Sequence, residues 1–330
     1  MSMRAAVIGC GFIGAGTSVP GAGAQSHAAA WRDAGDVTLA ALVEPDAARL
    51  ASAGARWGVD ALYLDVASML EATRPELVSV ASPDPTHADV LEQVLAAPSV
   101  RAVLAEKPLA MDVERAERLV RMADERDIIL AVNYSRRYAP SYRRLASWLE
   151  SAPIGTIHRV DGIYVRGIKH NGTHWLDLAR WLAGEITEVR GHGAVEPGAT
   201  DATIDAELRF ASGAIGSLHG LREVDYSLFE LDLLGSAGRV RVTGSGGRFE
   251  AWTSSPSRLF PGFFDLVPID CPAGDLTDLL GHAVRDLLTA LRTGRPPAGT
   301  AAAAVAALQL AAEAMAGAQA EEGRHATIGR

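Results

Sequence analysis

The sequence predicts an α/β protein that begins with a doubly wound parallel sheet and continues into a second α/β domain built on a large, mostly antiparallel sheet. Three observations lead to this prediction. Short apolar segments alternate with helical segments over the first third of the chain, a glycine-rich turn follows the first apolar segment, and strands succeed one another from about residue 186. A chain of 330 residues is long enough for two domains. We expect them at residues 1–132 and 133–330.

In the first domain the apolar segments are short and rich in Val, Leu and Ala, which suits a parallel sheet covered on both faces. The helical segments between them supply the crossovers of a doubly wound fold. Strands are expected at Ala5–Ile8, Thr38–Val43, Leu77–Ala81, Ala102–Ala105 and Ile128–Val132, and helices at Ser26–Ala34, Asp46–Trp57, Thr86–Ala96 and Val113–Asp127.

In the second domain, residues 186–249 are expected to form mostly antiparallel strands, divided by turns at Gly213 and Gly235–Gly238. These strands are expected at Ala202–Phe210, where polar and apolar positions alternate, and at Ala214–Leu221, Leu228–Leu234 and Arg239–Thr243. Such a sheet has an open face, and open faces often become subunit interfaces, so we expect a homodimer or homotetramer. Gly317 is placed to end the last helix. Helices are expected at Pro140–Leu149, Thr173–Leu182, Leu276–Arg292 and Thr300–Ala316, and a strand at Ile157–Val165.

The composition narrows the class of partner. The net charge is −9 and the chain has no long basic run, which argues against nucleic acid and against an anionic membrane surface. No run of about 18 apolar residues predicts a membrane-spanning helix. Cys10 and Cys271 lie far apart in the sequence, so we expect two free thiols in a cytoplasmic protein rather than a disulfide framework.

The glycine-rich turn has the pattern GxGxxG, with residues Gly9, Gly11, Phe12, Ile13 and Gly14 as the expected contacts of a dinucleotide. The first glycine permits a tight turn, the second lets a pyrophosphate approach the backbone, and the third allows close packing of helix on strand. Between a strand and a helix this pattern predicts a Rossmann dinucleotide site rather than an ordinary turn. The late helix start leaves a long loop at residues 15–25, which either contacts cofactor or substrate or has no binding role.

Glu44 ends the second predicted strand. An acidic residue there accepts hydrogen bonds from the adenosine ribose and repels a 2′-phosphate, so NAD is expected and NADP is disfavoured. The other interpretation is a solvated glutamate, because the spacing from the glycine turn exceeds the usual ~20 residues.

Glu106, Lys107 and Pro108 follow the predicted strand Ala102–Ala105. Ligands of open α/β sheets bind at the carboxyl ends of the strands. A lysine at that position can orient a substrate hydroxyl and stabilise a developing alkoxide. The tripeptide alone is weak evidence, since most lysines are simply solvated.

Together, five segments resemble the Gfo/Idh/MocA family, named for glucose–fructose oxidoreductase, inositol dehydrogenase and a rhizopine-catabolism protein. They occur in the family's order, and the resemblance covers nearly the whole chain. The resemblance implies a Rossmann domain, a second α/β domain, and hydride transfer between a nicotinamide and a secondary alcohol or ketone of a sugar or cyclitol. The segments are Gly9–Gly14, Ala81–His87, Glu106–Pro108, Asn133–Tyr138 and His174–Leu178.

The resemblance also implies roles for individual residues. Lys107 corresponds to the active-site lysine, with Glu106 beside it at the cofactor. Arg136 lies near the domain junction and either contacts the substrate or forms a structural salt bridge. The residues implied to line the nicotinamide side are Pro83, Thr86 and His87.

His174 falls where the family has its catalytic histidine, which takes the alcohol proton as the hydride leaves. Many family members carry an aspartate four residues earlier, where this sequence has His170. His170 either replaces that aspartate as donor, acceptor or proton relay, or marks a changed substrate or a weakened activity.

His170, His174 and Asp177 also resemble metal-ligand spacing. No metal is expected, because the segment lacks the glutamate of HExxH and Gly172 weakens a helix that would hold both rings on one face. Asn171 or Thr173 is a candidate cap for the helix that follows.

Basic residues gather just before His174. Arginine recognises carboxylates and phosphates, so one interpretation is an anionic substrate such as a nucleotide-linked or phosphorylated sugar. Ordinary surface charge is the other interpretation. The expected substrate contacts are Arg136, Arg166, Lys169, Asn171 and His174.

The sequence therefore predicts an NAD-dependent oxidoreductase acting on the CH–OH group of a sugar, cyclitol or nucleotide sugar. Two alternatives remain. One is a redox-neutral isomerase, epimerase or glycosidase that recycles a bound NAD, and the other is a cofactor-binding sensor without catalysis, since fold alone does not fix function.

Overall fold

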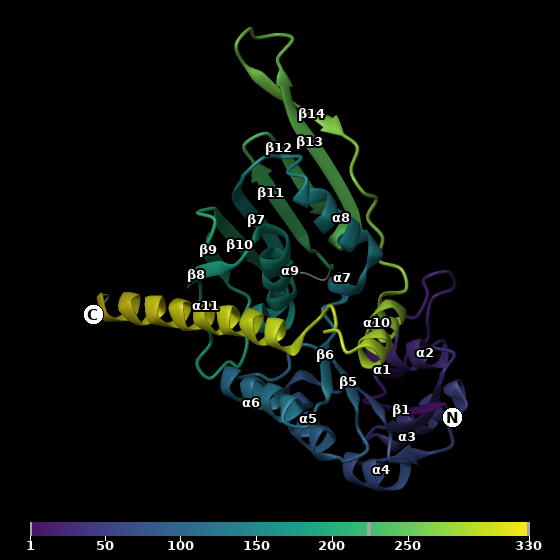
Figure 1. Ribbon diagram of the computed structural model, residues 1–330. Coiled ribbons are helices and arrows are strands. Elements are labelled where there is room, and N and C mark those ends of the chain that lie inside the picture. The colour runs from purple at the N-terminus through teal and green to yellow at the C-terminus, as the bar shows by residue number, and fades with distance from the viewer. Residues whose placement is uncertain (1, 223–225, 329–330) are drawn as a thin grey trace. The chain divides into compact units, whose positions relative to one another are not determined.

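The computed structural model describes residues 2–222 and 226–328, and the chain folds into two compact units (Figure 1). The first unit contains the residues up to Ala139 together with Thr277–Val305. The second contains Pro140–Leu276 and the residues from Ala306 on. A linear division at residue 133 places everything after it in one domain, whereas in the structure a later helix returns to the first unit, because its apolar face packs on the parallel sheet.

The first unit is built on six parallel strands in the order β3-β2-β1-β4-β5-β6. This is the strand order of a doubly wound sheet. All its strands are parallel, and the order in which the chain adds them to the sheet reverses between β1 and β4. The predicted parallel sheet is confirmed; β3 adds a two-residue strand that is too short to be recognised from sequence. The strands are β1 Met3–Ile8, β2 Val37–Val43, β3 Leu62–Tyr63, β4 Leu77–Val80, β5 Ala102–Ala105 and β6 Ile129–Val132.

Helices cover both faces of this sheet, and several begin at side chains that accept backbone N–H groups of the first turn. Ser26, Asp46, Asp65 and Asp112 cap α2, α3, α4 and α6 in this way. The helix α4 was not expected from the sequence. The helices are α1 Phe12–Ala15, α2 His27–Arg32, α3 Ala47–Trp57, α4 Val66–Thr73, α5 His87–Ala96, α6 Val113–Asp124, α7 Ser135–Tyr138 and α10 Leu279–Thr293.

The helix α10 lies beside α2 and contacts β5 and β6, and Figure 1 shows the two helices together. Trp31 of α2 and Leu287 of α10 are both fully buried in the core that these helices share with β1. Removing such large apolar side chains from water is the main contribution to the stability of this layer.

The second unit is built on an eight-stranded sheet in the order β14-β13-β12-β11-β7-β10-β9-β8. All neighbours are antiparallel except β7 and β10, so the predicted mostly antiparallel sheet is confirmed. The sequence did not predict the β13–β14 hairpin. The strands are β7 Ile157–Val165, β8 Ile186–His192, β9 Asp205–Phe210, β10 Ile215–Leu221, β11 Glu230–Gly235, β12 Gly238–Thr243, β13 Arg248–Pro256 and β14 Phe264–Ile269.

Two glycines let helices lie directly on one face of this sheet. Trp175 of α9 (Thr173–Ala183) occupies the space that a side chain at Gly162 would need, and a Cβ there would lie 1.8 Å from the indole nitrogen. A Cβ at Gly191 would lie 1.9 Å from the carbonyl oxygen of Ala314 in α11 (Ala301–Ile328). The unit also contains α8 (Pro140–Glu150).

The prediction that Gly317 ends the last helix is wrong, because α11 continues to Ile328. A Cβ at Gly317 would come within 3.1 Å of the Gly191 backbone, so this glycine serves close packing rather than termination. Residues 301–321 are long and apolar enough to pass as a membrane span by length and composition. More than half of that stretch is buried inside the protein, as in a core helix.

Candidate active site

The glycine turn between β1 and α1 has the geometry that a pyrophosphate site needs. Gly9 has φ 93°, and a Cβ there would lie 2.4 Å from the carbonyl oxygen of Ala81. A Cβ on Gly14 would lie 1.9 Å from the carbonyl oxygen of Gly9. At Gly11, by contrast, a Cβ would meet nothing within 4 Å. The first and third glycines are therefore required by the protein's own packing, while the second leaves open space beside the backbone, which fits an NAD pyrophosphate.

The loop at residues 15–25 is tied down within the first unit. Phe12 and Ile13 start a helix of only one turn, and the side chain of Phe12 is exposed. The backbone N–H of Ala24 donates to Oδ1 of Asp278 (2.8 Å), and the N–H of Asp278 donates to the carbonyl of Ala22 (2.9 Å). These contacts anchor the second half of the loop to the start of α10.

Glu44 follows β2 and reaches back to the glycine turn. Its Oε2 accepts from the backbone N–H of Cys10 (2.9 Å), and its Oε1 accepts from Arg49 (3.0 Å). The carboxylate is thus buried beside the turn, where the sequence placed it for a ribose contact. Burial, together with the charge of Glu44, raises the pKa of the Cys10 thiol to about 12, so Cys10 stays protonated and is no nucleophile. Both cysteines are free.

Glu106 and Lys107 follow β5, and both are buried. Oε1 of Glu106 accepts from Nε2 of His27 (3.0 Å) and from the carboxamide of Asn133 (2.7 Å). Burial by itself raises the pKa of Glu106, but the interactions with His27, with Asn133 and with the charge of Lys107 outweigh it, and the pKa lies below its usual value. A buried carboxylate and a buried ammonium group are therefore adjacent at the carboxyl end of the sheet.

The loop after β4 contains Pro83, Thr86 and His87. The hydroxyl of Thr86 donates to the carbonyl of Pro83 (2.7 Å) and so closes the short turn Asp84–Thr86. The buried ring of His87 lies between two carbonyl oxygens, with Nδ1 at 2.6 Å from Pro108 and Nε2 at 2.7 Å from Ser82. His87 therefore joins this loop to the segment that carries Lys107. The role of the three residues toward nicotinamide stays a prediction.

In the second unit, the segment from Arg166 to His174 has an unusual backbone. Arg166 adopts a left-handed conformation (φ 65°), which is uncommon for a residue other than glycine, and Gly167–Gly172 form a π-helical turn that runs into α9. Both features are frequent at functional sites. Asn171 and Thr173 do not cap α9, because the helical turn continues upstream; the Thr173 hydroxyl instead donates to the carbonyl of Lys169 (2.7 Å).

Asp201 holds this segment, although it was not among the residues that the sequence predicts for the site. Its carboxylate accepts from the backbone N–H groups of Lys169 (2.8 Å), His170 (3.0 Å) and Ala202 (2.9 Å). In the sequence, Asp201 is a single aspartate in a loop more than 30 residues after His170, and no local pattern connects it to the histidines. Its position shows that the turn carrying His170 is fixed by the loop before β9.

His170 and His174 are half-buried and lie on the same helical stretch, with Lys169 and Asn171 between or beside them. Arg166 is exposed. Arg136 is half-buried on α7, in the first unit. No group of three metal-ligating side chains occurs in the described part of the chain. The structure thus gathers four of the five predicted substrate contacts on one segment, and their roles stay predictions.

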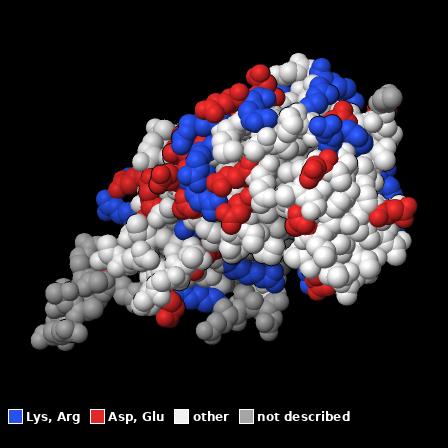
Figure 2. Space-filling view, turned by 90° about the horizontal axis from the view of Figure 1, so that it is seen from below, with Lys and Arg blue, Asp and Glu red and all other residues white. Residues whose placement is uncertain are grey.

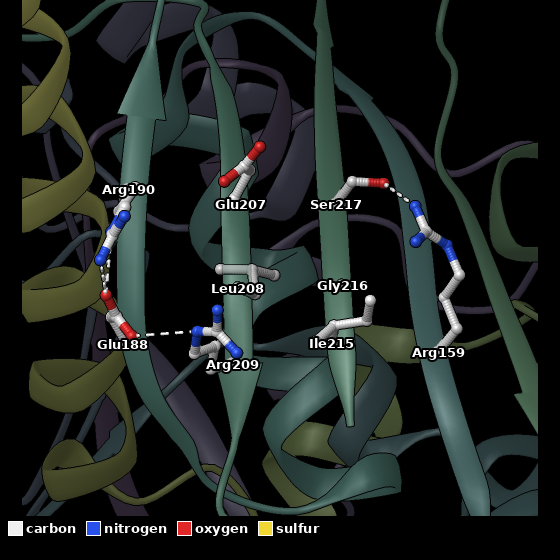
Figure 3. Close-up of a pocket in the computed structure, with 9 residues that line it drawn as sticks. All are labelled: Arg159, Glu188, Arg190, Glu207, Leu208, Arg209, Ile215, Gly216 and Ser217. Atoms are coloured by element: carbon white, nitrogen blue, oxygen red, sulfur yellow. Dashed lines mark hydrogen bonds and ion pairs between the residues drawn. The ribbon is translucent and has the colours of Figure 1, made fainter. Parts of the chain in front are cut away.

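The face of the large sheet opposite to α9 and α11 carries acidic and basic side chains on neighbouring strands (Figure 3). Glu188 forms ion pairs with Arg190 and Arg209, and the guanidinium group of Arg159 donates a hydrogen bond to the hydroxyl of Ser217 (3.4 Å). These residues surround a hollow of about 240 Å³ on β7–β10. On the face seen in Figure 2, basic and acidic side chains are likewise interspersed rather than gathered in a basic stripe.

Two family models match this chain. One describes an oxidoreductase family with an NAD-binding Rossmann fold and matches residues 3–134. The other describes the GFO/IDH/MocA C-terminal domain and matches residues 142–250. Together they cover more than half of the chain, and the first model shows that the glycine turn lies in an NAD-binding domain.

Individual relatives are more distant. The chain is 29% identical to D-apiose dehydrogenase of Paraburkholderia graminis over 56% of this chain and 51% of that protein, so the match spans about half of that relative. It is 27% identical to myo-inositol 2-dehydrogenase of Thermotoga maritima over 72% of this chain and 74% of that protein. The solved structure of UDP-N-acetylglucosamine 3-dehydrogenase from Acidithiobacillus ferrooxidans covers 97% of this chain and 99% of its own, with a TM-score of 0.76. At 23% identity, that likeness shows the fold alone.

Proposed function

This chain belongs to the Gfo/Idh/MocA oxidoreductase family, and on that premise we propose that it transfers a hydride between NAD and a secondary alcohol or ketone of a sugar, cyclitol or nucleotide sugar. The observation that carries the proposal is the buried Glu106–Lys107 pair at the carboxyl end of β5 in an NAD-binding domain. The relatives named as apiose and inositol dehydrogenases support the substrate class.

NAD supplies the hydride acceptor or donor when it is bound. The chain must supply the rest, which is to orient the reacting oxygen and to move one proton. The Lys107 ammonium group donates a hydrogen bond to the reacting oxygen and stabilises its negative charge as the proton leaves. His174 accepts that proton during oxidation and returns it during reduction. Arg136, Arg166, Lys169 and Asn171 are proposed substrate contacts, and His170 a donor or relay to His174.

We propose that the loops after β1, β2, β4 and β5 bind successive parts of the cofactor. Gly9, Gly11, Phe12, Ile13 and Gly14 hold the pyrophosphate, and Glu44 the adenosine ribose. The nicotinamide is held by Glu106 and Lys107 with the loop of Pro83, Thr86 and His87.

The molecule is proposed to act in the cytoplasm as a homodimer or homotetramer. The charged face of the large sheet would form the subunit interface, since its alternating ion pairs offer both signs of charge to a second copy. Light scattering of the purified protein measures the assembly; a monomer at micromolar concentration would refute this part of the proposal.

The test of the activity uses the two lysines of the chain, Lys107 and Lys169, as a matched pair. The protein is incubated with NAD⁺ and a panel of cyclitols, neutral sugars and anionic sugars, and NADH is followed by absorbance. Lys107→Met is expected to lower turnover on every substrate by about 10²–10³-fold. Lys169→Met is expected to lower it only on anionic substrates, and an equal effect on neutral ones would refute an anion-binding role.

The alternatives predict different signals. A redox-neutral enzyme converts its substrate while the total NADH stays constant, and a sensor binds NAD⁺ with no turnover on any substrate. Either result would overturn the proposed dehydrogenase.

A further inference from the structure

A chain of buried polar side chains leads from α2 to Glu106, and neither the proposed mechanism nor the family motifs use it. His27 and Trp31 lie one turn apart on α2 and are both fully buried. The indole N–H of Trp31 donates to the hydroxyl of Ser79 (2.7 Å), and that hydroxyl lies 2.9 Å from Nδ1 of His27. Nε2 of His27 lies 3.0 Å from Oε1 of Glu106.

The directions of these hydrogen bonds follow from the donor-only indole. Ser79 accepts from Trp31, so its own proton is free for Nδ1 of His27, the only other polar atom that the hydroxyl meets among the described residues. Nδ1 is then an acceptor, and the ring proton lies on Nε2 and is donated to Glu106. Every bond in the chain thus points toward the carboxylate.

The two oxygens of Glu106 differ in consequence. Oε1 accepts from His27 and from the Asn133 carboxamide, whereas Oε2 makes no hydrogen bond within the described part of the chain. Because the Asn133 nitrogen faces the carboxylate, its Oδ1 points elsewhere, and this buried atom also has no partner there. Because Oδ1 is buried and points away from the carboxylate, Oε2 of Glu106 is the acceptor left for a bound group. An anionic oxygen in this position suits an N–H donor such as that of an amide group.

We propose that His27 is a positioning residue that acts through Glu106, filling Oε1 so that Oε2 remains to accept an N–H group of the nicotinamide carboxamide. This inference rests on the proposed binding of nicotinamide beside Glu106 and Lys107, and it adds a residue on a different element to that site.

The arrangement makes cofactor binding sensitive to protonation of Glu106. A proton on this carboxyl group must sit on Oε2, since Oε1 already accepts two hydrogen bonds, so the proton and the cofactor's N–H compete for one oxygen. The titratable groups that act on Glu106 are His27 from α2 and Lys107 beside it. These interactions hold the pKa of Glu106 below its usual range, so the wild-type site stays ionised well into the acid range.

Removing the His27 donor should raise the pKa of Glu106, because one of the hydrogen bonds that stabilise its ionised form in this buried position is lost. Loss of one hydrogen bond to a charged group corresponds to a rise of about 1–2 pH units. The affinity for NAD⁺ would then fall about tenfold for each pH unit below the raised pKa.

The experiment is a titration of the full-length protein with NAD⁺ by calorimetry between pH 5 and about pH 9, with thermal unfolding measured at each pH. His27→Leu is expected to show a Kd that rises relative to wild type as the pH falls, and His27→Gln, which keeps an N–H donor, should move that loss back toward wild type. Ser26→Ala is the matched control, since it removes the N-cap of the same helix and leaves Glu106 untouched. It should lower the melting temperature and change Kd by the same factor at every pH.

Ser79→Ala replaces His27→Leu if that variant does not fold. Without the Ser79 hydroxyl, the proton of the His27 ring is no longer held on Nε2. The loss of NAD⁺ affinity at low pH should then move in the same direction as in His27→Leu, by a smaller amount. A ratio of mutant to wild-type Kd that is constant across pH for His27→Leu, or for Ser79→Ala in its place, would overturn the positioning role while leaving the proposed dehydrogenase intact. A wild-type protein that binds no NAD⁺ at any pH would overturn both.

Discussion

The glycine turn offers a test in which the same substitution, glycine to alanine, should have opposite consequences at two positions three residues apart. At Gly11 the backbone has φ −67° and ψ −169°, which any residue adopts, and a Cβ meets nothing within 4 Å. At Gly14 a Cβ would lie 1.9 Å from the carbonyl oxygen of Gly9, so the backbone must move.

Gly11→Ala is therefore expected to change the free energy of unfolding by less than about 0.5 kcal/mol, as for a surface substitution. The added methyl group occupies the space proposed for the pyrophosphate, and we expect the Kd for NAD⁺ to rise at least about tenfold, which is ~1.4 kcal/mol. Gly14→Ala should instead cost about 1–3 kcal/mol of stability through overpacking, and lower the melting temperature by several degrees.

Calorimetric titration with NAD⁺ and thermal unfolding of both variants measure the two effects separately. The reasoning would be refuted by a Gly11→Ala protein that binds NAD⁺ as tightly as wild type, since the open space at that position would then not be the pyrophosphate site. A Gly14→Ala protein as stable as wild type would refute the packing argument.

Two further predictions concern aspartates that hold segments near the site. Asp201→Ala should lower the free energy of unfolding by about 1–3 kcal/mol, because three backbone N–H groups lose their acceptor. It should also lower turnover more than Asp201→Asn, which keeps one acceptor oxygen. Denaturant unfolding and the NADH assay measure the two effects, and an unchanged turnover in Asp201→Ala would contradict the prediction. Burial raises the pKa of Asp278, but the Ala24 N–H and Arg285 outweigh it, so its pKa is depressed and its contribution is present above the unfolded value of about 3.9 and lost as the pH falls through the folded pKa. Asp278→Asn should thus lower the melting temperature at neutral pH, and below about pH 4 its melting temperature should fall less steeply with pH than that of the wild type. Melting temperatures that fall equally steeply in the two proteins would contradict this.

The sequence could predict the parallel sheet because its strands are mostly apolar, and a strand such as Ala102–Ala105 is buried on both faces and apolar at every position. The glycine turn could also be predicted, because the positive φ of Gly9 and the contact of Gly14 with the Gly9 carbonyl both arise within the turn itself. The turn at Gly235–Gly238 joins β11 and β12 for the same local reason. Contacts of this kind depend on residues near in sequence, and pattern reasoning can reach them.

Other features depend on residues far apart in the chain. Gly317 looked like a helix end, but its lack of a side chain serves packing on Gly191, which only the tertiary structure reveals. The return of α10 to the first unit, the anchoring of the His170 segment by Asp201 and the link from His27 to Glu106 join residues 31 to more than 100 positions apart. By itself, the sequence determined the fold class, the cofactor and the family, because these follow from local patterns. The tertiary structure decided which polar side chains hold the site in place, because hydrogen-bond partners are chosen by position in space rather than by order along the chain.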